Sequence, residues 1–315
     1  MKSGSNLEKV LTAGHFAVTA ELGPPAGTDV EFVRKKAELL RGAVDAVNVT
    51  DNQTAVVRMS SVAVSALLAQ MGIEPVMQMV CRDRNRIAMQ SDILGAVALG
   101  IRNLTCLTGD HQGFGNQPGA KKVFDIDSVQ LVSIVKRMRD EHRLLGSDEE
   151  IAGAVPMLIG AAANPFAKPY EFRALRLAKK VEAGADYVQT QCIYDVPMFA
   201  AWMKAVRDLG VHEKCRILAG ITPLKTAGMA RYMAENVPGI IIPEAILKRM
   251  SGAPKGKGAE TGLAICAEII EQLRGIEGVA GIHIMAIEWE QKVREIVETG
   301  TASRRSPPAL ACRSP

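Results

Sequence analysis

The chain has 315 residues, 48% of them hydrophobic, which is enough to bury a large core in one or two domains. Its net charge of +4 is spread along the sequence and only 4% of residues are aromatic, which argues against nucleic-acid binding. The absence of a long apolar stretch, of a secretory N-terminal core and of any Cys-x-x-Cys among six cysteines predicts a cytoplasmic protein that does not bind membranes.

The first half of the chain alternates predicted strands and helices. A β-prone run at 18–22 ends at Gly23-Pro24-Pro25, which leaves Glu21 near the carboxyl end of the first strand, because proline cannot donate to a sheet. The next predicted elements are helix 29–42, strand 44–50, helix 55–71, strand 75–81, helix 86–99 and strand 102–108. The glycine-rich loop 109–119 that follows is unusually long, and its backbone amides are placed to cradle an anionic group.

The second half continues the alternation. Its predicted elements are helix 127–142, strand 152–159, loop 160–165, helix 169–183, strand 185–191, helix 196–209, strand 215–221, helices 226–236, 243–251 and 259–273, strand 281–285 and helix 288–298. The short apolar run 239–243 is assigned to a loop because it ends in proline.

Eight strands, each followed by a helix, predict a single (β/α)8 TIM barrel over residues 15–299. Residues 1–14 are expected to form an N-terminal segment, and residues 300–315 a disordered tail. An open doubly wound sheet is the alternative. The lack of a Gly-x-Gly-x-x-Gly turn after the first strand counts against it.

In such a barrel the carboxyl ends of all strands meet at one mouth, and polar residues stand at most of these ends. They are Glu21, Asn48, Thr50, Gln78, Thr108, Asp110, Asn164, Gln191, Thr222 and either His283 or Glu288. The set contains amides, hydroxyls and carboxylates with little charge. This set of residues does not contain the three clustered protein ligands that a zinc site needs, so no metal is predicted.

Four segments of the sequence, in this order and spacing, resemble the methylenetetrahydrofolate reductase family. They are Glu21 before Gly23-Pro24-Pro25, the triplet 108–110 (Thr-Gly-Asp), the run 183–191 (AGADYVQTQ) and the run 220–223 (GITP). The resemblance covers about residues 15–299 and is strongest to the form found in anaerobic folate-using bacteria. It implies an oxidoreductase: a flavin-containing barrel that reduces 5,10-methylenetetrahydrofolate to 5-methyltetrahydrofolate.

The resemblance also implies roles for individual residues. Glu21 matches the general acid of the family, Asp110 an aspartate that faces both folate and flavin, and Gln191 and Thr222 lie in substrate-binding motifs. The remaining positions that match flavin contacts are Thr50, Gln78, Thr108, Gly109, Asn164 and Lys180.

The sequence departs from the family pattern at three places. Gln78 stands where many members have histidine, the stretch 160–164 lacks the usual aromatic and histidine contacts, and Met285 replaces a common aromatic residue. Because of these changes, two cofactors are considered, the FAD of the family and FMN. Two kinds of electron donor are also considered, NAD(P)H and a reducing partner protein such as a cysteine-rich subunit. An oligomer is expected.

The implied chemistry suits these residue types. Opening the five-membered ring of the substrate needs a proton donor, for which a partly shielded carboxylic acid is appropriate, and the resulting iminium accepts hydride. A second carboxylate stabilises that cation, and a glutamine matches the amide-like edge of a pterin. Two alternatives remain: a pterin-dependent methyltransferase barrel without flavin, and a non-catalytic electron-transfer subunit of a larger complex.

Overall fold

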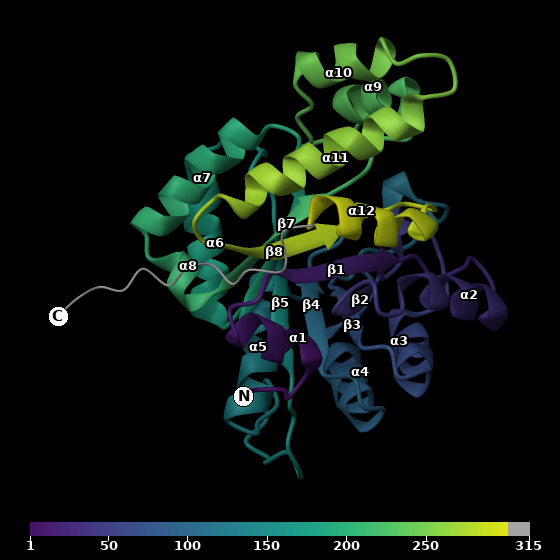
Figure 1. The fold of residues 1–315 in the computed structure, drawn as a ribbon. Coiled ribbons are helices and arrows are strands. Elements are labelled where there is room, and N and C mark those ends of the chain that lie inside the picture. The colour runs from purple at the N-terminus through teal and green to yellow at the C-terminus, as the bar shows by residue number, and fades with distance from the viewer. Residues whose placement is uncertain (302–315) are drawn as a thin grey trace.

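The computed structural model describes residues 1–301 and closes eight parallel strands into one barrel, in chain order from β1 to β8 (Figure 1). The strands are β1 (Ala17–Leu22), β2 (Ala46–Val49), β3 (Pro75–Val80), β4 (Asn103–Leu107), β5 (Leu158–Ala163), β6 (Tyr187–Cys192), β7 (Arg216–Ile221) and β8 (Val279–Ile284). The pairing of β8 with β1 closes the ring, with Thr19 opposite His283. The predicted TIM barrel is therefore confirmed.

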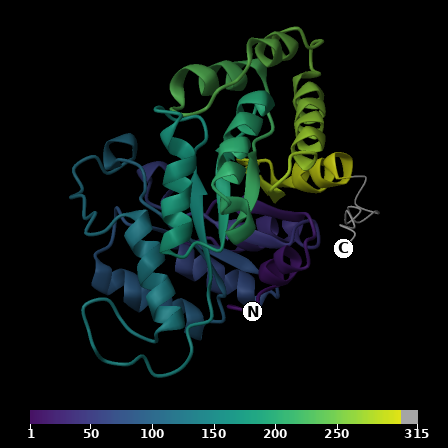
Figure 2. The same ribbon diagram turned by 90° about the vertical axis from the view of Figure 1, so that its left-hand side faces the viewer.

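Helices surround the barrel, and α5, α6 and α7 stand side by side on one flank (Figure 2). The helices are α1 (Asn6–Thr12), α2 (Val30–Leu40), α3 (Ser61–Gln70), α4 (Arg86–Ala98), α5 (Ser128–Asp140), α6 (Phe172–Ala183), α7 (Val196–Asp208), α8 (Val211–Lys214), α9 (Ala227–Asn236), α10 (Glu244–Ser251), α11 (Gly258–Arg274) and α12 (Val293–Gly300). Asp29 and Asp195 are the N-caps of α2 and α7, and each accepts a backbone amide of the first turn. No helix in this part of the chain is both long and apolar enough to cross a bilayer.

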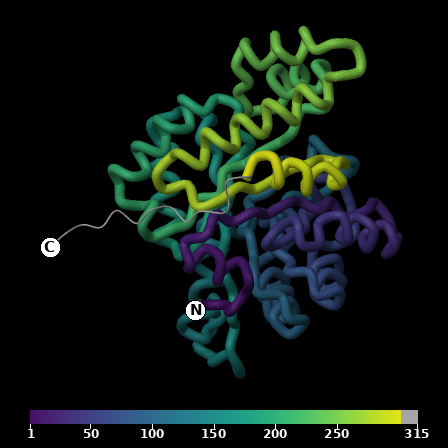
Figure 3. Tube along the Cα trace, viewed as in Figure 1, coloured from purple at the N-terminus to yellow at the C-terminus, as the bar shows by residue number. Residues whose placement is uncertain are grey.

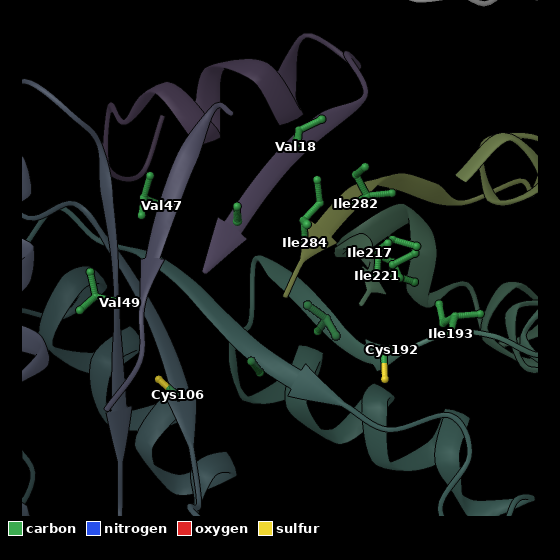
Figure 4. Close-up of a cluster of buried hydrophobic side chains, with 14 of the residues drawn as sticks. Val18, Val47, Val49, Cys106, Cys192, Ile193, Ile217, Ile221, Ile282 and Ile284 are labelled. Carbon is green, nitrogen blue, oxygen red and sulfur yellow. The ribbon is translucent and has the colours of Figure 1, made fainter. Parts of the chain in front are cut away.

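Side chains alternate between the two faces of each strand, and this alternation separates the main core from the barrel interior. Valine and isoleucine side chains of β1, β2, β7 and β8 point outward and form part of the core between sheet and helices (Figure 4). The intervening residues of β1, which are Ala17, Thr19 and Glu21, face the interior and lead from its base to the mouth.

The N-terminal helix α1 covers the amino-terminal end of the barrel. Leu7 and Leu11 are buried against interior residues at the strand starts, among them Ala17 and Tyr187. At the opposite end of the chain, α12 packs beside α2, so the first and last units of the barrel lie next to each other (Figure 3). The predicted tail 300–315 lies outside the described residues except for Gly300, which belongs to α12, and the hydrogen-bonded Thr301.

Two helical predictions need correction, and one short helix was missed. The helix predicted at 55–71 begins at Ser61, because positive φ angles at Asn52, Thr54 and Ala55 interrupt the backbone and Ser60 caps the later start. The helix predicted at 288–298 is a 3-10 turn at 290–292 followed by α12, since Glu288 has a φ of 49°. The short helix α8 was not predicted.

The fifth strand was predicted at 152–159 and is found at Leu158–Ala163. Its sequence is Leu-Ile-Gly-Ala-Ala-Ala. Because glycine and alanine have a low intrinsic β-propensity, the residues from 160 onward were assigned to a loop. Glycine is required at position 160, because a Cβ there would lie 2.3 Å from Cζ of Tyr187. The segment is a strand because it pairs with β4 on one side and β6 on the other, although its local sequence preference does not indicate one.

Candidate active site

A cavity of about 450 Å³ opens at the carboxyl ends of the strands. This is where TIM barrels place their binding sites, and the volume is in the range of small-molecule pockets. The cavity brings together nine of the predicted site residues, which are Glu21, Thr50, Gln78, Thr108, Gly109, Asp110, Asn164, Lys180 and Gln191.

Three other predicted mouth residues lie elsewhere. Thr222 is buried behind the barrel wall, where its carbonyl accepts a hydrogen bond from the Tyr194 hydroxyl and it lines a separate, much smaller cavity. Asn48 is fully buried one layer below the mouth. Of the two residues considered for the eighth strand, His283 lines the cavity and Glu288 does not.

Glu21 lies at the inner end of the cavity with its side chain 15% exposed. The amide nitrogen of Gln78 donates to Glu21 Oε1 at 3.4 Å, and Nε2 of His283 lies 3.5 Å from the same oxygen. The second oxygen, Oε2, has no hydrogen-bond partner within residues 1–301. One side of the carboxyl group therefore faces two side-chain nitrogens.

A buried polar layer lies beneath Glu21. Asn48 and Gln189 form a reciprocal amide pair across the barrel, with N–O distances of 2.7 and 3.0 Å. Gln189 also donates to the Thr19 hydroxyl at 3.1 Å. These mutual hydrogen bonds satisfy side chains that would otherwise be costly to bury, and they give the cavity a rigid floor.

One wall of the cavity is cationic. Lys180 of α6 is buried and donates from Nζ to the carbonyl of Ala162 at 2.6 Å. Burial, with the nearby charge of Arg176, lowers the pKa of Lys180 to about 8. Arg176 lies one turn earlier on the same helix and makes no hydrogen bond or ion pair with any other residue described by the structure. Arg173, one turn further back, completes the wall.

Two loops frame the other side of the cavity. Arg82 lies two residues after the end of β3, is buried, and donates to Asp83 and to the carbonyls of Asn52 and Asp110. The residue next to Asp110, Gly109, has a φ of 92°, and a Cβ there would lie 3.1 Å from Cβ of both Arg82 and Val80. Glycine is therefore required where this loop leaves β4.

The glycine-rich loop 109–119 makes hydrogen bonds within itself that were not predicted. The amides of Gly113, Phe114 and Gly115 already donate to His111 or to the carbonyls of His111 and Gln112. They do not form the anion cradle expected from the sequence. The loop instead packs on the β2–α3 connection, since a Cβ on Gly115 would lie 1.8 Å from the carbonyl oxygen of Ala55.

Sequence reasoning missed the arginines of this site. It predicted a mouth with little charge, but Arg82, Arg173 and Arg176 join Lys180 in the cavity lining. Arg82 carried a usable signal, because it comes one residue after Cys81 at the end of a predicted strand. The α6 arginines carried a weaker one, the spacing of three and four residues that places them on the same helix face as Lys180.

The described cysteines are free and buried, and burial raises the pKa of each thiol, for Cys81 and Cys192 to about 12. They therefore remain protonated and act as apolar core residues. Within residues 1–301, no group of three or more histidine, cysteine, aspartate or glutamate side chains is arranged to hold a metal ion.

A family model described as methylenetetrahydrofolate reductase matches residues 6–301. A relative from Caenorhabditis elegans named probable methylenetetrahydrofolate reductase (NADPH) is 24% identical over 246 residues, which are 76% of this chain and 34% of the relative. A 5,10-methylenetetrahydrofolate reductase from Salmonella typhimurium is 24% identical over 231 residues, covering 72% of this chain and 70% of the relative. The chain thus spans about a third of the longer, C. elegans relative.

Among solved structures, the barrel resembles an uncharacterised protein from Clostridium thermocellum that binds two copies of 5-methyl-5,6,7,8-tetrahydrofolic acid. The TM-score is 0.64, with 95% of this chain and 99% of that chain covered. At 12% sequence identity the likeness supports the shared fold alone.

Proposed function

The chain belongs to the methylenetetrahydrofolate reductase family, and on this premise we propose that it is an oxidoreductase that converts 5,10-methylenetetrahydrofolate into 5-methyltetrahydrofolate. The observation that carries the proposal is the position of Glu21. It is the carboxyl group at the inner end of a cavity that is large enough for a planar heterocycle and is lined by amide, hydroxyl and cationic side chains.

Glu21 is the proposed proton donor. Its oxygen Oε2 is uncommitted and Glu21 borders the cavity, so a substrate nitrogen bound there can receive its proton. Protonation makes that nitrogen a leaving group. The C–N bond of the substrate ring then breaks, and the remaining ring nitrogen and the methylene carbon form an iminium.

Asp110 and Gln191 are the proposed substrate-binding partners. The Asp110 carboxylate lines the cavity and makes no side-chain hydrogen bond with any residue in the described range, so it is available to stabilise the iminium charge. The side-chain oxygen of Gln191 accepts the Cys192 amide at 3.1 Å, which fixes the side chain and leaves its amide nitrogen to donate to a pterin edge.

The residues around the cavity fit a flavin nucleotide, which would supply the hydride when bound. The Thr50 hydroxyl is buried at the cavity without a hydrogen-bond partner in the described structure, so it is available to a ligand atom. Lys180 and Arg176 would hold its anionic phosphate group. Gln78, Thr108, Gly109 and Asn164 would complete the contacts, with FAD expected from the family and FMN as the alternative.

The proposed electron donor is either a reduced nicotinamide or a reducing partner protein, including a cysteine-rich subunit. The name of one relative of this chain specifies NADPH, and the name of another specifies NADH. Met285, rather than an aromatic residue, lines this cavity, which removes one surface for stacking a nicotinamide ring.

The function is tested with the purified full chain. We expect a yellow protein that releases FAD or FMN on heating, and whose dithionite-reduced flavin is reoxidised by methylenetetrahydrofolate with formation of 5-methyltetrahydrofolate. A colourless protein that binds the folate would indicate the methyltransferase alternative. A flavoprotein whose reduced flavin is not reoxidised by the folate would indicate an electron-transfer subunit.

The low pKa of Lys180 predicts that flavin binding depends on pH. The protonated form binds an anion and predominates below about pH 8, so affinity is lost as the pH rises through this value. Flavin titrations followed by fluorescence quenching should show a dissociation constant about tenfold higher at pH 9 than at pH 7. Lys180→Arg should remove this dependence, since arginine stays charged, and Lys180→Met should bind weakly at both values. An unchanged pH dependence in Lys180→Met would contradict the assignment.

A further inference from the structure

His283 is a buried titratable residue directly below Glu21 that the mechanism above does not use. Its side chain is 3% exposed, and β8 places it beside Thr19 of β1, two residues before Glu21. The imidazole lies between two groups. Nε2 faces Glu21 Oε1 at 3.5 Å, and Nδ1 faces the Thr19 hydroxyl at 2.9 Å.

The polar layer determines which ring nitrogen of His283 carries the hydrogen. Asn48 orients the Gln189 amide, whose nitrogen lies 3.1 Å from Thr19 Oγ1 and 3.3 Å from His283 Nδ1. An amide nitrogen cannot accept, so a hydrogen on Nδ1 could be received only by Thr19 Oγ1 and would also face the N–H of Gln189. The Thr19 hydroxyl accepts from Gln189, and its own hydrogen has two acceptors within reach, Nδ1 at 2.9 Å and the carbonyl of Ile282 at 3.5 Å, of which Nδ1 is the nearer. Nδ1 is therefore the acceptor, and the neutral ring carries its hydrogen on Nε2, facing Glu21.

This tautomer places a second N–H donor at Glu21 Oε1, beside the amide of Gln78 at 3.4 Å. A protonated carboxyl group accepts hydrogen bonds at its carbonyl oxygen and donates through the other oxygen. Two donors at Oε1 make that atom the carbonyl oxygen, so the proton resides on Oε2. We propose that His283 is a positioning residue that keeps the transferable proton of Glu21 on the cavity-facing oxygen; this rests on the proposed reductase function.

A pair of substitutions separates the two contacts of the imidazole. The amide nitrogen of glutamine reaches about as far as Nε2 of histidine, and the amide oxygen of asparagine, an acceptor, reaches about as far as Nδ1. His283→Gln therefore keeps a donor toward Glu21, whereas His283→Asn keeps a partner only for Thr19 and Gln189. If His283 has only a structural role in the polar layer, His283→Asn should be the more active variant. If His283 positions the proton of Glu21, His283→Gln should be the more active one.

We expect both variants to retain flavin and to be reduced by dithionite at near wild-type rates. In stopped-flow single turnovers, His283→Asn should oxidise its reduced flavin with saturating methylenetetrahydrofolate about 10- to 100-fold more slowly than wild type. His283→Gln should recover most of this rate, with the substrate dissociation constant little changed in both. The inference is overturned if His283→Asn stays within twofold of wild type, or if His283→Gln is as slow as His283→Asn.

A second measurement does not depend on folate turnover. Nitrogen NMR of the wild-type chain with ¹⁵N-labelled histidine should show His283 as the neutral Nε2–H tautomer, with its signals assigned by their loss in His283→Gln. An Nδ1–H tautomer or a doubly protonated ring overturns the inference. If wild type is not reoxidised by the folate, the proposed function fails, and the NMR result still decides the orientation of His283 toward Glu21.

Discussion

Glu21→Gln is expected to slow the oxidation of the reduced flavin by methylenetetrahydrofolate by about a hundredfold to ten-thousandfold, or roughly 3–5 kcal/mol of barrier. Glutamine keeps the size and most hydrogen bonds of the side chain but has no transferable proton. Because protonation precedes hydride acceptance by the substrate, the loss should fall entirely on this half-reaction. Flavin content and the rate of flavin reduction by dithionite should stay near wild type. Stopped-flow absorbance resolves the two half-reactions.

The matched control is Glu31→Gln, the same substitution on the exposed surface of α2, where Arg34 is the only ion-pair partner of the side chain among residues 1–301. Both half-reactions of this variant should be unchanged. If Glu21→Gln reoxidises within a few-fold of wild type, Glu21 is not the proton donor and the mechanism proposed above is wrong. If the Glu21→Gln variant loses flavin as well, the role of Glu21 is to form the cavity.

The second large effect concerns stability. Asp51 follows Thr50 at the mouth, has a fully buried side chain, and accepts Arg84 Nη1 at 2.6 Å, Arg84 Nη2 at 3.2 Å and the Val80 amide at 2.9 Å. Burial acts to lower the pKa of Arg84, but the hydrogen bonds and charge of Asp51, with smaller contributions from two other aspartates, raise it overall. This pair therefore holds the β2–α3 and β3–α4 loops together around the cavity.

Asp51→Ala should lower the free energy of unfolding by about 3 kcal/mol, near the lower end for breaking a buried ion pair. The value is at the lower end because Asp92 still contacts Arg84 at 3.0 Å and the Arg84 side chain is 16% exposed. Urea denaturation of the full chain measures the change. Asp208→Ala, which removes an exposed pair with Lys204, is the control and should change stability by less than about 0.5 kcal/mol. Equal effects in the two variants would contradict the structural role of Asp51.

Much of this site follows from the sequence through the two-residue period of a strand. Val18, Ala20 and Leu22 are apolar, so the residues between them face the opposite side, and Gly23-Pro24-Pro25 places Glu21 at the mouth. The same period places Thr50, Gln78 and Gln191 in the cavity lining. Eight such units with helices between them specify the barrel, because each apolar strand face must be covered by a helix that follows it in the chain.

The tertiary structure alone decided the features that depend on partners far apart in the sequence. β5 forms because it pairs with β4 and β6, and its residue 160 is glycine because the Tyr187 ring occupies the space where a Cβ would lie. Thr222 has the expected position in the chain, yet its contact with Tyr194 holds it behind the barrel wall. His283 contacts Thr19 and Gln189, which lie on other strands and which no local pattern connects with it. Local preference determines which segments become strands in every case but β5, whereas the side chains that meet inside the closed barrel determine what each residue at the mouth can do.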